Sequence, residues 1–489
     1  MKKIRLGLHG FGEHPWRSVD RTRGFYLDAL TPEFELSFAE GSFAESGVDA
    51  VLSFVGGSAW DDLCSAKVPY LFAIHGGATL DHVALRSHAG RLRSADTLIV
   101  NCASDETILR KMFIGRGPRF CRLPLPAGGA YFGEIEPAYA REQLPFEGEP
   151  DLVLGFVARL LPQKNFHRFL GMLAELSELL APRRIDAVVI GEYWTDYPVL
   201  PYMTRDYREY VAALARELGV KDRVVYLGSG LDDEQLRLAY GAMDVLLHPT
   251  CSLDENFGYV PIEAMASGVP VVGAAYGGLK DTILHGETGY LMPTWTTSSG
   301  LRMDLIGGVE HTARLLRDPA LRARLAGRAR SHAQAQYSRP LCAERLVSAV
   351  REAVEAYALA APLQAAPPLA FPRPAGYLPP LKVGWEHYWP VVDDYVQGAL
   401  PSIGETTRLR LAAPAYFEAS RLKLLDPAWP ATIPLEPEER RICLACQTTR
   451  YRSELGAEDA LLDALVAKGA LIASNLAEGG RLAWPRASA

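Results

Sequence analysis

The stretch DENFGYVPIEAMASGVPVV, residues 254–272, determines how the rest of the chain is interpreted. It follows the strand-like run MDVLLHPT and contains a helix-like segment in which Pro261 suits the first turn and Gly268 suits the end. A second apolar run, VPVV, closes the stretch. The pattern predicts a strand, a loop, a helix and another strand, which is the repeating unit of a parallel α/β sheet.

Two glutamates, Glu255 and Glu263, flank the predicted start of this helix. The free backbone N–H groups of Phe257 through Val260 and the helix dipole favour an anion such as a diphosphate, and Gly258 lets a bulky ligand approach. Glu263, expected in the first helical turn, suits the paired hydroxyls of a ribose, and Glu255 suits the hydroxyls of an attached sugar. The spacing therefore fits a nucleotide sugar, although either glutamate taken singly is more typical of a solvated or capping residue than of a ligand-binding one.

The same alternation of strands and helices extends over most of the chain. Residues 1–146 contain the apolar runs IRLGLHG, VDAVLSFVGG, PYLFAIHGG and DTLIVNCAS, and the pattern restarts after an acidic, turn-rich break at residues 144–151. Continuous apolar runs predict strands buried on both faces of a parallel sheet. We therefore expect an α/β protein with two doubly wound, Rossmann-like domains, residues 1–146 and 147–360, facing a cleft.

A third region follows a proline-rich segment. Residues 361–380 hold seven prolines, a density that predicts a semi-rigid linker. Residues 381–489 are expected to form a small α+β accessory domain of unknown role, with a helix that stops at Gly469 and a hairpin around Gly479 and Gly480. That order is compatible with a winged helix. Recruiting an acceptor, lengthening the acceptor groove and driving homo-oligomerisation are the three roles left open for this region.

Composition narrows the class of partner and the compartment. The formal charge of −7 and the pI near 5.9 argue against nucleic acid as a partner. No apolar run approaches the ~18 residues of a membrane-spanning helix, and the seven scattered cysteines fit a reducing compartment, so we expect a cytoplasmic protein. The basic and apolar stretch at residues 108–122 has two interpretations: a half-buried helix and loop, or peripheral contact with the inner face of a membrane.

Three motifs together resemble a known family. The segments GFVARLLPQKNFHRFL, ENFGYVPIEAMASGVPVV and GGLKDTILHGETGYLMP are similar to those of the retaining GT-B glycosyltransferases of family 4, whose signature is two glutamates separated by seven residues. The similarity is strong over residues 150–360, weaker over 1–145, and absent from the last 110 or so. It implies a GT-B fold and transfer of a sugar from a nucleotide-diphosphate sugar to an acceptor that the sequence does not identify, with retention of anomeric configuration.

The resemblance also implies roles for individual residues of the second domain. Arg159 and Lys164 match the basic pair that grips the donor diphosphate, and Lys164 thereby supports departure of the leaving group. Glu255 matches the residue that faces the donor sugar, and Glu263 matches the ribose ligand. The segment that touches sugar and phosphate matches the backbone of Asn256, Phe257, Gly258 and Tyr259.

In the first domain the resemblance rests on two loops. HGFGEH places Gly10 and Gly12 where family members carry a glycine loop near the diphosphate. FAIHGG places His75 at a strand end, where family members carry a histidine facing the donor sugar, although a lone histidine is as often structural. The loop at residues 191–210 departs from the family pattern, because it is longer and more aromatic than the short glycine-rich loop usual there, which leaves the nucleobase end of the pocket undefined.

No metal or other cofactor is expected. The sequence lacks the Asp-x-Asp pair that would hold Mg²⁺ or Mn²⁺ on a donor diphosphate, so Arg159, Lys164 and the helix N-terminus are expected to take up the charge of the leaving group. Cys443 and Cys446 form a CxxC, but no second ligand pair stands at zinc spacing. Two alternatives to a transferase stay open: a nucleotide-sugar epimerase or hydrolase of the same fold, and a degenerate sugar-binding scaffold or adaptor.

Overall fold

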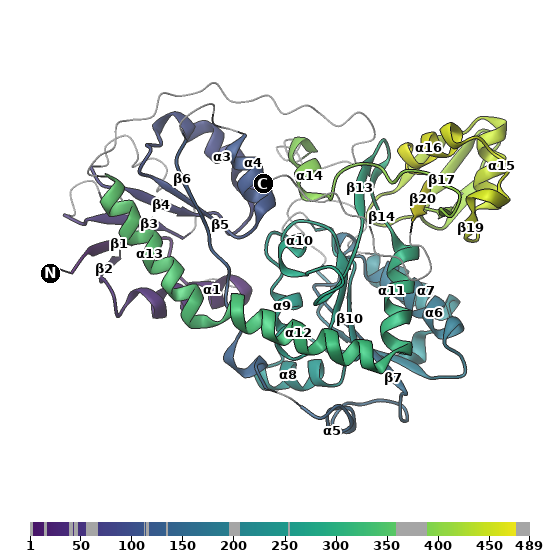
Figure 1. The fold of residues 1–489 in the computed structure, drawn as a ribbon, viewed down its shortest axis with the longest axis horizontal. Helices are drawn as coiled ribbons and strands as arrows, with labels where there is room; N and C mark the ends of the chain where they lie inside the picture. The colour runs from purple at the N-terminus through teal and green to yellow at the C-terminus, as the bar shows by residue number, and fades with distance from the viewer. Residues whose placement is uncertain are drawn as a thin grey trace.

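The first sheet confirms the first predicted α/β unit. In this computed structural model the described residues are 3–13, 17–38, 43, 47–54, 67–111, 113, 117–133, 135–194, 206–252, 255–357 and 389–475. Six parallel strands run in the order β2-β1-β3-β4-β5-β6 (Figure 1). They are β1 (Arg5–His9), β2 (Glu35–Phe38), β3 (Ala50–Ser53), β4 (Tyr70–Ala73), β5 (Thr97–Val100) and β6 (Arg119–Arg122), accompanied by helices α1 (Arg17–Leu30), α3 (Ala78–His88) and α4 (Ala103–Arg110). Strands β3, β4 and β5 are buried at every position, which is why they are continuously apolar.

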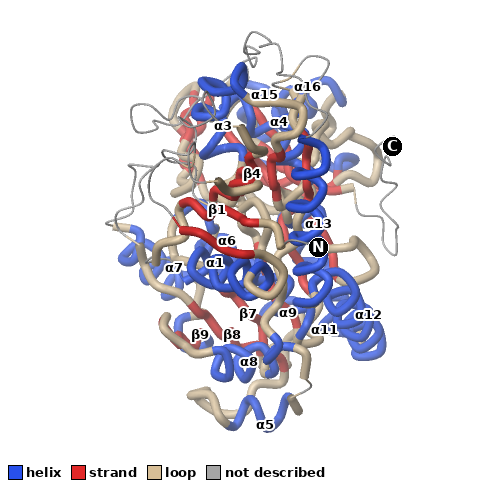
Figure 2. The backbone as a smooth tube through the Cα atoms, turned by 90° about the vertical axis from the view of Figure 1, so that its left-hand side faces the viewer, coloured by secondary structure: helices blue, strands red, loops and turns tan. Residues whose placement is uncertain are grey.

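The second sheet is also parallel and six-stranded, in the order β12-β11-β10-β7-β8-β9. Its strands are β7 (Leu152–Val157), β8 (Ile185–Ile190), β9 (Val224–Gly228), β10 (Val245–His248), β11 (Val271–Ala274) and β12 (Gly289–Met292). Its helices are α6 (Phe166–Leu179), α7 (Tyr207–Glu217), α8 (Asp233–Gly241), α9 (Tyr259–Ala266), α10 (Leu279–Thr282) and α11 (Leu305–Arg317). Figure 2 shows β1 and β4 of the first sheet above β7, β8 and β9 of the second. The second order reverses between β7 and β10, as in a Rossmann fold.

Two long helices connect the domains after the second sheet. Helix α12 (Pro319–Tyr337) packs on α9, and helix α13 (Arg339–Tyr357) returns to the first domain, where it lies on α1 and on strands β3 and β4 (Figure 1). The end of the segment expected to belong to the second domain thus covers the first sheet. The predicted linker at 361–380 lies outside the described residues.

The described part of the third region, residues 389–475, docks on the second domain. It contains α14 (Trp389–Tyr395), α15 (Pro437–Ala445), α16 (Asp459–Ala467) and two three-stranded antiparallel sheets, β19-β15-β20 and β16-β17-β18. These strands are β15 (Arg408–Leu411), β16 (Ala415–Phe417), β17 (Arg421–Leu424), β18 (Ala431–Pro434), β19 (Arg450–Tyr451) and β20 (Leu471–Ser474). Gly469, at a φ of 76°, ends the last helix as predicted. The hairpin expected at Gly479 and Gly480 lies outside the described residues.

A β-hairpin of the second domain packs against the third region. Strands β13 (Thr294–Thr297) and β14 (Gly300–Met303) reach toward it, as Figure 1 shows. Arg302 of β14 is buried, and its guanidinium donates to the carbonyl of Gly469 at 2.8 Å. At Gly300, a Cβ would come within 2.6 Å of the ring of Trp429, so only glycine permits this approach. The third region is therefore packed into the second domain as a part of its structure.

Candidate active site

Segments 90 residues apart meet where the strand order of the second sheet reverses. Strands β7 and β10 are neighbours, and the turn after β7 carries Lys164 while the loop after β10 carries Glu255. The backbone N–H of Cys251 donates to the carbonyl of Gln163 at 3.1 Å, which joins the turn to the loop. In open parallel sheets, ligands bind outside the carboxyl ends of the strands at such a reversal.

Helix α9 begins one residue after Gly258. Gly258 has a φ of 85°, and a Cβ there would approach the Leu279 side chain to 2.9 Å. Pro261 lies in the first turn and Gly268, at a φ of 77°, follows the end, as predicted. The placement of Glu263 in the first turn was wrong, because the helix starts at Tyr259 and Glu263 is its fifth residue. Its side chain therefore lies about one turn after the N-terminus of the helix.

Lys164 and Glu255 form a buried ion pair. The Nζ of Lys164 donates to Oε2 of Glu255 at 2.7 Å, and each residue is only 7% exposed. His248 lies on the other side, with its Nε2 3.9 Å from Oε1. Burial alone would raise the pKa of Glu255, but Lys164 and His248 together outweigh it, and the pKa falls to about 2. The predicted basic residue and the predicted acid therefore meet, with the acid ionised.

Arg159 lies in a different environment from Lys164. Its guanidinium stacks over the ring of Trp194 at 4.8 Å, and the residue is half-buried. Trp194 begins the aromatic loop that departs from the family pattern, and residues 195–205 of that loop lie outside the described residues. The interaction is a cation–π contact, which orients the guanidinium against the ring of Trp194.

Glu263 is buried between the two domains. Its Oε1 accepts from Arg21 of α1, and its Oε2 accepts from the hydroxyl of Tyr240 at 3.0 Å. A carboxylate offers about four acceptor positions, so two are left after these contacts. Glu263 is thus oriented by the protein and keeps acceptor capacity.

Arg21 is a residue that the sequence interpretation missed. Its guanidinium lies over the rings of Tyr131 and Tyr259, at 5.5 Å and 5.3 Å, while it pairs with Glu263. The next residue, Thr22, shares a 2.7 Å hydrogen bond with the hydroxyl of Tyr259. Helix α1 of the first domain therefore contacts α9 of the second domain through both Arg21 and Thr22. The spacing of Arg17 and Arg21, one turn apart, was the available signal, since Arg17 pairs with Asp233 of α8 in the same way.

His75 is packed in the first domain, and its backbone lies next to Asn256 of the loop that carries Glu255. Its Nδ1 lies 2.9 Å from Oδ1 of Asn101 and its Nε2 lies 3.0 Å from the hydroxyl of Tyr26. Asn256 donates to the His75 backbone carbonyl at 3.0 Å. Burial lowers the pKa of His75 to about 4, although the contact with Asn101 opposes the shift. The ring of His75 is thus held as a neutral group by partners from the first domain, and within the described residues only its backbone carbonyl is shown in contact with the second domain.

His75 should remain neutral over the usual assay range. Since its pKa of about 4 lies below the ordinary value of about 6.5, the folded protein takes up this proton only in acid. We expect its ring resonances in two-dimensional NMR to show no titration between about pH 5.5 and 8. His88, on α3 near Arg91, provides a control ring that is less enclosed. A midpoint near that of a free histidine would contradict the prediction.

The other residues that were predicted to contact the donor lie in the loop after β1 and at the start of α9. Gly10, at a φ of 75°, turns the chain after β1, and Gly12 is exposed, with open space where a Cβ would meet nothing within 4 Å. Phe257 is buried, with its ring 5.3 Å from that of Tyr259, and Val260 is half-buried in the first turn of α9.

Two further sequence predictions concern metals and membranes. The described residues contain no group of three or more potential metal ligands among His, Cys, Asp and Glu. Cys443 and Cys446 are buried free thiols, and burial raises the pKa of each to about 12. Within the described parts of the chain, we find no helix with the length and apolarity needed to cross a bilayer. In the stretch at 108–122, Arg110 and Arg122 pair with Glu106.

The fold and the site define a class of protein. Two facing Rossmann-like domains, with a buried acid and lysine at the strand reversal of the second, are the arrangement of GT-B proteins, and residues 140–332 match the model of the family described as glycosyl transferases group 1. The family resemblance is therefore confirmed over residues 140–332. Among its relatives, a D-inositol 3-phosphate glycosyltransferase of Stackebrandtia nassauensis is 31% identical over 266 residues, which is 53% of this chain and 55% of that protein.

A 2-deoxystreptamine glucosyltransferase of Streptomyces kanamyceticus is 33% identical over 187 residues, covering 38% of this chain and 41% of that protein. The chain thus matches about half, or less, of the length of these curated relatives. Among solved structures, sucrose-phosphate synthase from Thermosynechococcus elongatus aligns with a TM-score of 0.57 at 20% identity, over 72% of this chain and 100% of that one. Anabaena HepE in complex with UDP-glucose aligns with a TM-score of 0.52 at 17% identity, over 71% and 99%. These likenesses show the GT-B fold.

Proposed function

We propose that this protein is a metal-independent, retaining glycosyltransferase that moves a sugar from a nucleotide-diphosphate sugar to an acceptor. The observation that carries the proposal is the buried ion pair of Lys164 and Glu255 at the strand reversal of a group 1 glycosyltransferase domain. Keeping an ionised pair out of water costs several kcal/mol per charge, so such a pair is more readily explained by a ligand than by stability.

The roles follow from where each side chain lies. Lys164 and Arg159 bind the diphosphate, together with the N–H groups of Gly258, Tyr259 and Val260 at the start of α9. Glu255 accepts from the hydroxyls of the donor sugar, and Glu263 from those of the ribose. From the first domain, Gly10 and Gly12 approach the diphosphate and His75 approaches the sugar. These residues close on the donor from both domains and exclude water, which would otherwise hydrolyse it.

The reaction needs no separate nucleophile on the enzyme. The acceptor oxygen forms its bond to the anomeric carbon on the face from which the diphosphate leaves, while the bond from that carbon to the phosphate oxygen breaks. The proton of the acceptor passes to the departing phosphate oxygen. Lys164 stabilises the charge that grows on that oxygen, and a preorganised donor of this kind contributes about 3 to 4 kcal/mol.

A panel of nucleotide sugars tests the proposal. UDP-glucose is the first probe, because a protein of the same fold, HepE, has been solved with it, and GDP- and ADP-sugars follow. Slow release of nucleoside diphosphate from one donor at millimolar concentration supports a transferase that hydrolyses its donor when no acceptor is present. Binding of none of them would favour the degenerate sugar-binding scaffold. A product in which the sugar is altered but still attached to the nucleotide would favour an epimerase.

Glu263→Ala should weaken donor binding by about 10- to 100-fold, since a hydrogen bond to a charged group contributes about 1.5 to 3 kcal/mol. The substitution removes the acceptor proposed for the ribose hydroxyls and leaves Arg21 without its carboxylate. Calorimetric titration with UDP measures the effect. Glu234→Ala, at an exposed position of α8, is the matched control. An unchanged dissociation constant in Glu263→Ala would remove Glu263 from the site.

The setting of the reaction is also proposed. The six cysteines among the described residues are all free thiols, which supports a reducing compartment such as the cytoplasm. Peripheral contact with a membrane and self-association through the C-terminal region remain predictions. We keep the boundaries 1–146, 147–360, 361–380 and 381–489 as the proposed division of the chain. The succession α15, β19, α16 and β20 supports a winged-helix-like module within the last of these.

A further inference from the structure

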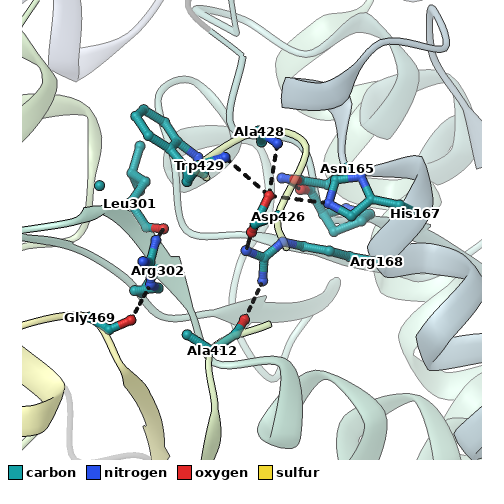
Figure 3. A network of polar contacts seen from close by, with 12 residues as sticks. Asn165, His167, Arg168, Leu301, Arg302, Ala412, Asp426, Ala428, Trp429 and Gly469 are labelled. Carbon is teal, nitrogen blue, oxygen red and sulfur yellow. Dashed lines mark hydrogen bonds and ion pairs between the residues drawn. The ribbon is translucent and has the colours of Figure 1, made fainter. Parts of the chain in front are cut away.

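The third region places a buried carboxylate against the donor side of the second domain. Asp426 is 3% exposed, and Figure 3 shows it between Arg168 and His167 at the start of α6. Arg168 donates to its Oδ2, and Nε2 of His167 lies 3.5 Å from its Oδ1. The backbone N–H groups of Ala428 and Trp429 donate to Oδ1 at 2.8 Å and 3.1 Å. Asp426 is therefore fixed within its own loop and fixes α6 in turn.

The charges around Asp426 make this contact specific. Burial opposes its ionisation, but Arg168, His167 and Arg302 together outweigh burial and hold the pKa of Asp426 far below its ordinary value. Arg168 is 8% exposed and Arg302 is 1% exposed, and the charge of Asp426 favours both cations. A buried anion between two buried cations cannot be exchanged for a neutral group without leaving a charge uncompensated.

The start of α6 is directly linked to Lys164. A single 3-10 turn, Pro162–Lys164, ends at Asn165, which has a φ of 60° and donates from its Nδ2 to the carbonyl of Pro249 at 2.7 Å. His167 and Arg168 follow immediately, in the first turn of α6. A turn this short leaves little freedom between them, so a displacement of the α6 start moves the Lys164 ammonium.

A second contact reaches the loop that carries Glu255. Tyr395, at the end of α14, is fully buried, and its carbonyl accepts from the N–H of Gly277 at 2.8 Å. The N–H of Gly278 donates to the Glu255 carbonyl at 3.1 Å, and a Cβ on Gly277 would lie 1.9 Å from that carbonyl oxygen and 3.0 Å from the Tyr395 ring. The Tyr395 hydroxyl donates to Asp105 of the first domain. Tyr395 therefore packs between the two domains, next to the loop that carries Glu255.

We propose that the third region is an integral part of the candidate active site, in which Asp426 positions the turn that carries Lys164 and Tyr395 positions the loop that carries Glu255. The inference rests on the proposed function and deepens it. The two contacts act on opposite members of one ion pair, whose 2.7 Å separation depends on both segments holding their places. Both are positioning residues, because each acts through the backbone of another segment.

Conservative variants test the proposal on the full-length protein. Asp426→Asn keeps the size of the side chain. Tyr395→Phe removes the hydroxyl that anchors Tyr395 to Asp105, so that the Tyr395 carbonyl is no longer held against the N–H of Gly277. Arg408→Gln is the matched control, because Arg408 lies in the same interface. One of its guanidinium nitrogens donates to Glu310 of α11 at 2.6 Å, and α11 carries neither Lys164 nor Glu255. We expect donor hydrolysis in the two test variants to lose about 10- to 100-fold in kcat with KM within about twofold of the control, as for misplaced catalytic groups.

Amide hydrogen exchange provides a readout that needs no donor. In Asp426→Asn, exchange should accelerate in the segment 160–170, and in Tyr395→Phe in the segment 255–260, each relative to Arg408→Gln, while strand β4 of the first sheet keeps its protection. If both segments exchange as in the control, or if kcat matches the control in both folded variants, the inference is overturned. If wild type turns over no nucleotide sugar while the exchange pattern appears as expected, the proposed function fails and the positioning role stands.

Discussion

Lys164→Ala should lower turnover of the best nucleotide-sugar donor by about 100- to 1,000-fold, the loss expected when one preorganised donor is removed from a developing negative charge. The ammonium has two tasks in the buried pair. In the proposed mechanism it stabilises the leaving diphosphate, and together with His248 it holds the pKa of Glu255 at about 2, so that the acid is ionised. Both tasks are lost together. Initial rates of nucleoside diphosphate release measure the effect.

The same substitution changes the response to acid. Because the pKa of Glu255 in the folded protein lies below the ordinary value of about 4.3, the pair stabilises the fold above that pH and loses this contribution as the pH falls toward 2. Without Lys164, burial raises the pKa of Glu255, and the acid limb of both activity and stability should move upward. Lys221→Ala, at an exposed position, is the control. A kcat within twofold of this control would exclude Lys164 from the chemistry.

Asp426→Ala should destabilise the protein by about 3 to 5 kcal/mol, the range for breaking a buried ion pair by removing one partner. The cost arises from Arg168, which is left buried without its carboxylate, and from Arg302, which loses a favourable charge nearby. Since the pKa of Asp426 is lowered by folding, the pair stabilises the protein above about pH 4 and ceases to do so in strong acid. Chemical denaturation near pH 7 measures the free energy of unfolding.

A double variant identifies the cause of that loss. Arg168→Met combined with Asp426→Leu removes both charges and fills their volume, and should recover most of the stability, because apolar replacements of a buried pair are often neutral. Arg452→Ala, which breaks the ion pair with Asp459 at the surface, should change the free energy of unfolding by less than about 1 kcal/mol. If Asp426→Ala proves no more destabilising than Arg452→Ala, the network in Figure 3 does not hold the third region in place.

Local sequence patterns predicted the two parallel sheets, and the family resemblance supplied the candidate residues of the site. The runs that are apolar at every position became strands buried on both faces, as in β4 and β10, and Gly258 and Pro261 marked the helix between loop and sheet. Lys164 and Glu255 were predicted as a phosphate ligand and a sugar ligand, and the structure brings them together at 2.7 Å. Glu263 was expected one turn too close to the helix start, because the pattern did not fix the first helical residue.

Residues that act across an interface could not be found in this way. Arg21 meets Glu263 over 242 positions of sequence, and Arg168 meets Asp426 over 258. The one-turn spacing of Arg17 and Arg21 marks one face of α1 but does not identify a partner for either residue, and Arg168 stands in no local pattern that differs from that of a solvated helix face. The return of α13 to the first sheet has the same origin, since an amphipathic helix shows which face it buries but not which domain supplies the partner.

The chain order of apolar runs, glycines and prolines therefore determined by itself that two parallel α/β units would form and that a helix would begin between Glu255 and Glu263, because these features depend on neighbours within a few residues. Only the tertiary structure decided that α1 clasps the second domain and that the third region packs behind Lys164 and Glu255. Those contacts join surfaces that are complementary in shape and charge only after each domain has folded, and no local periodicity records that complementarity.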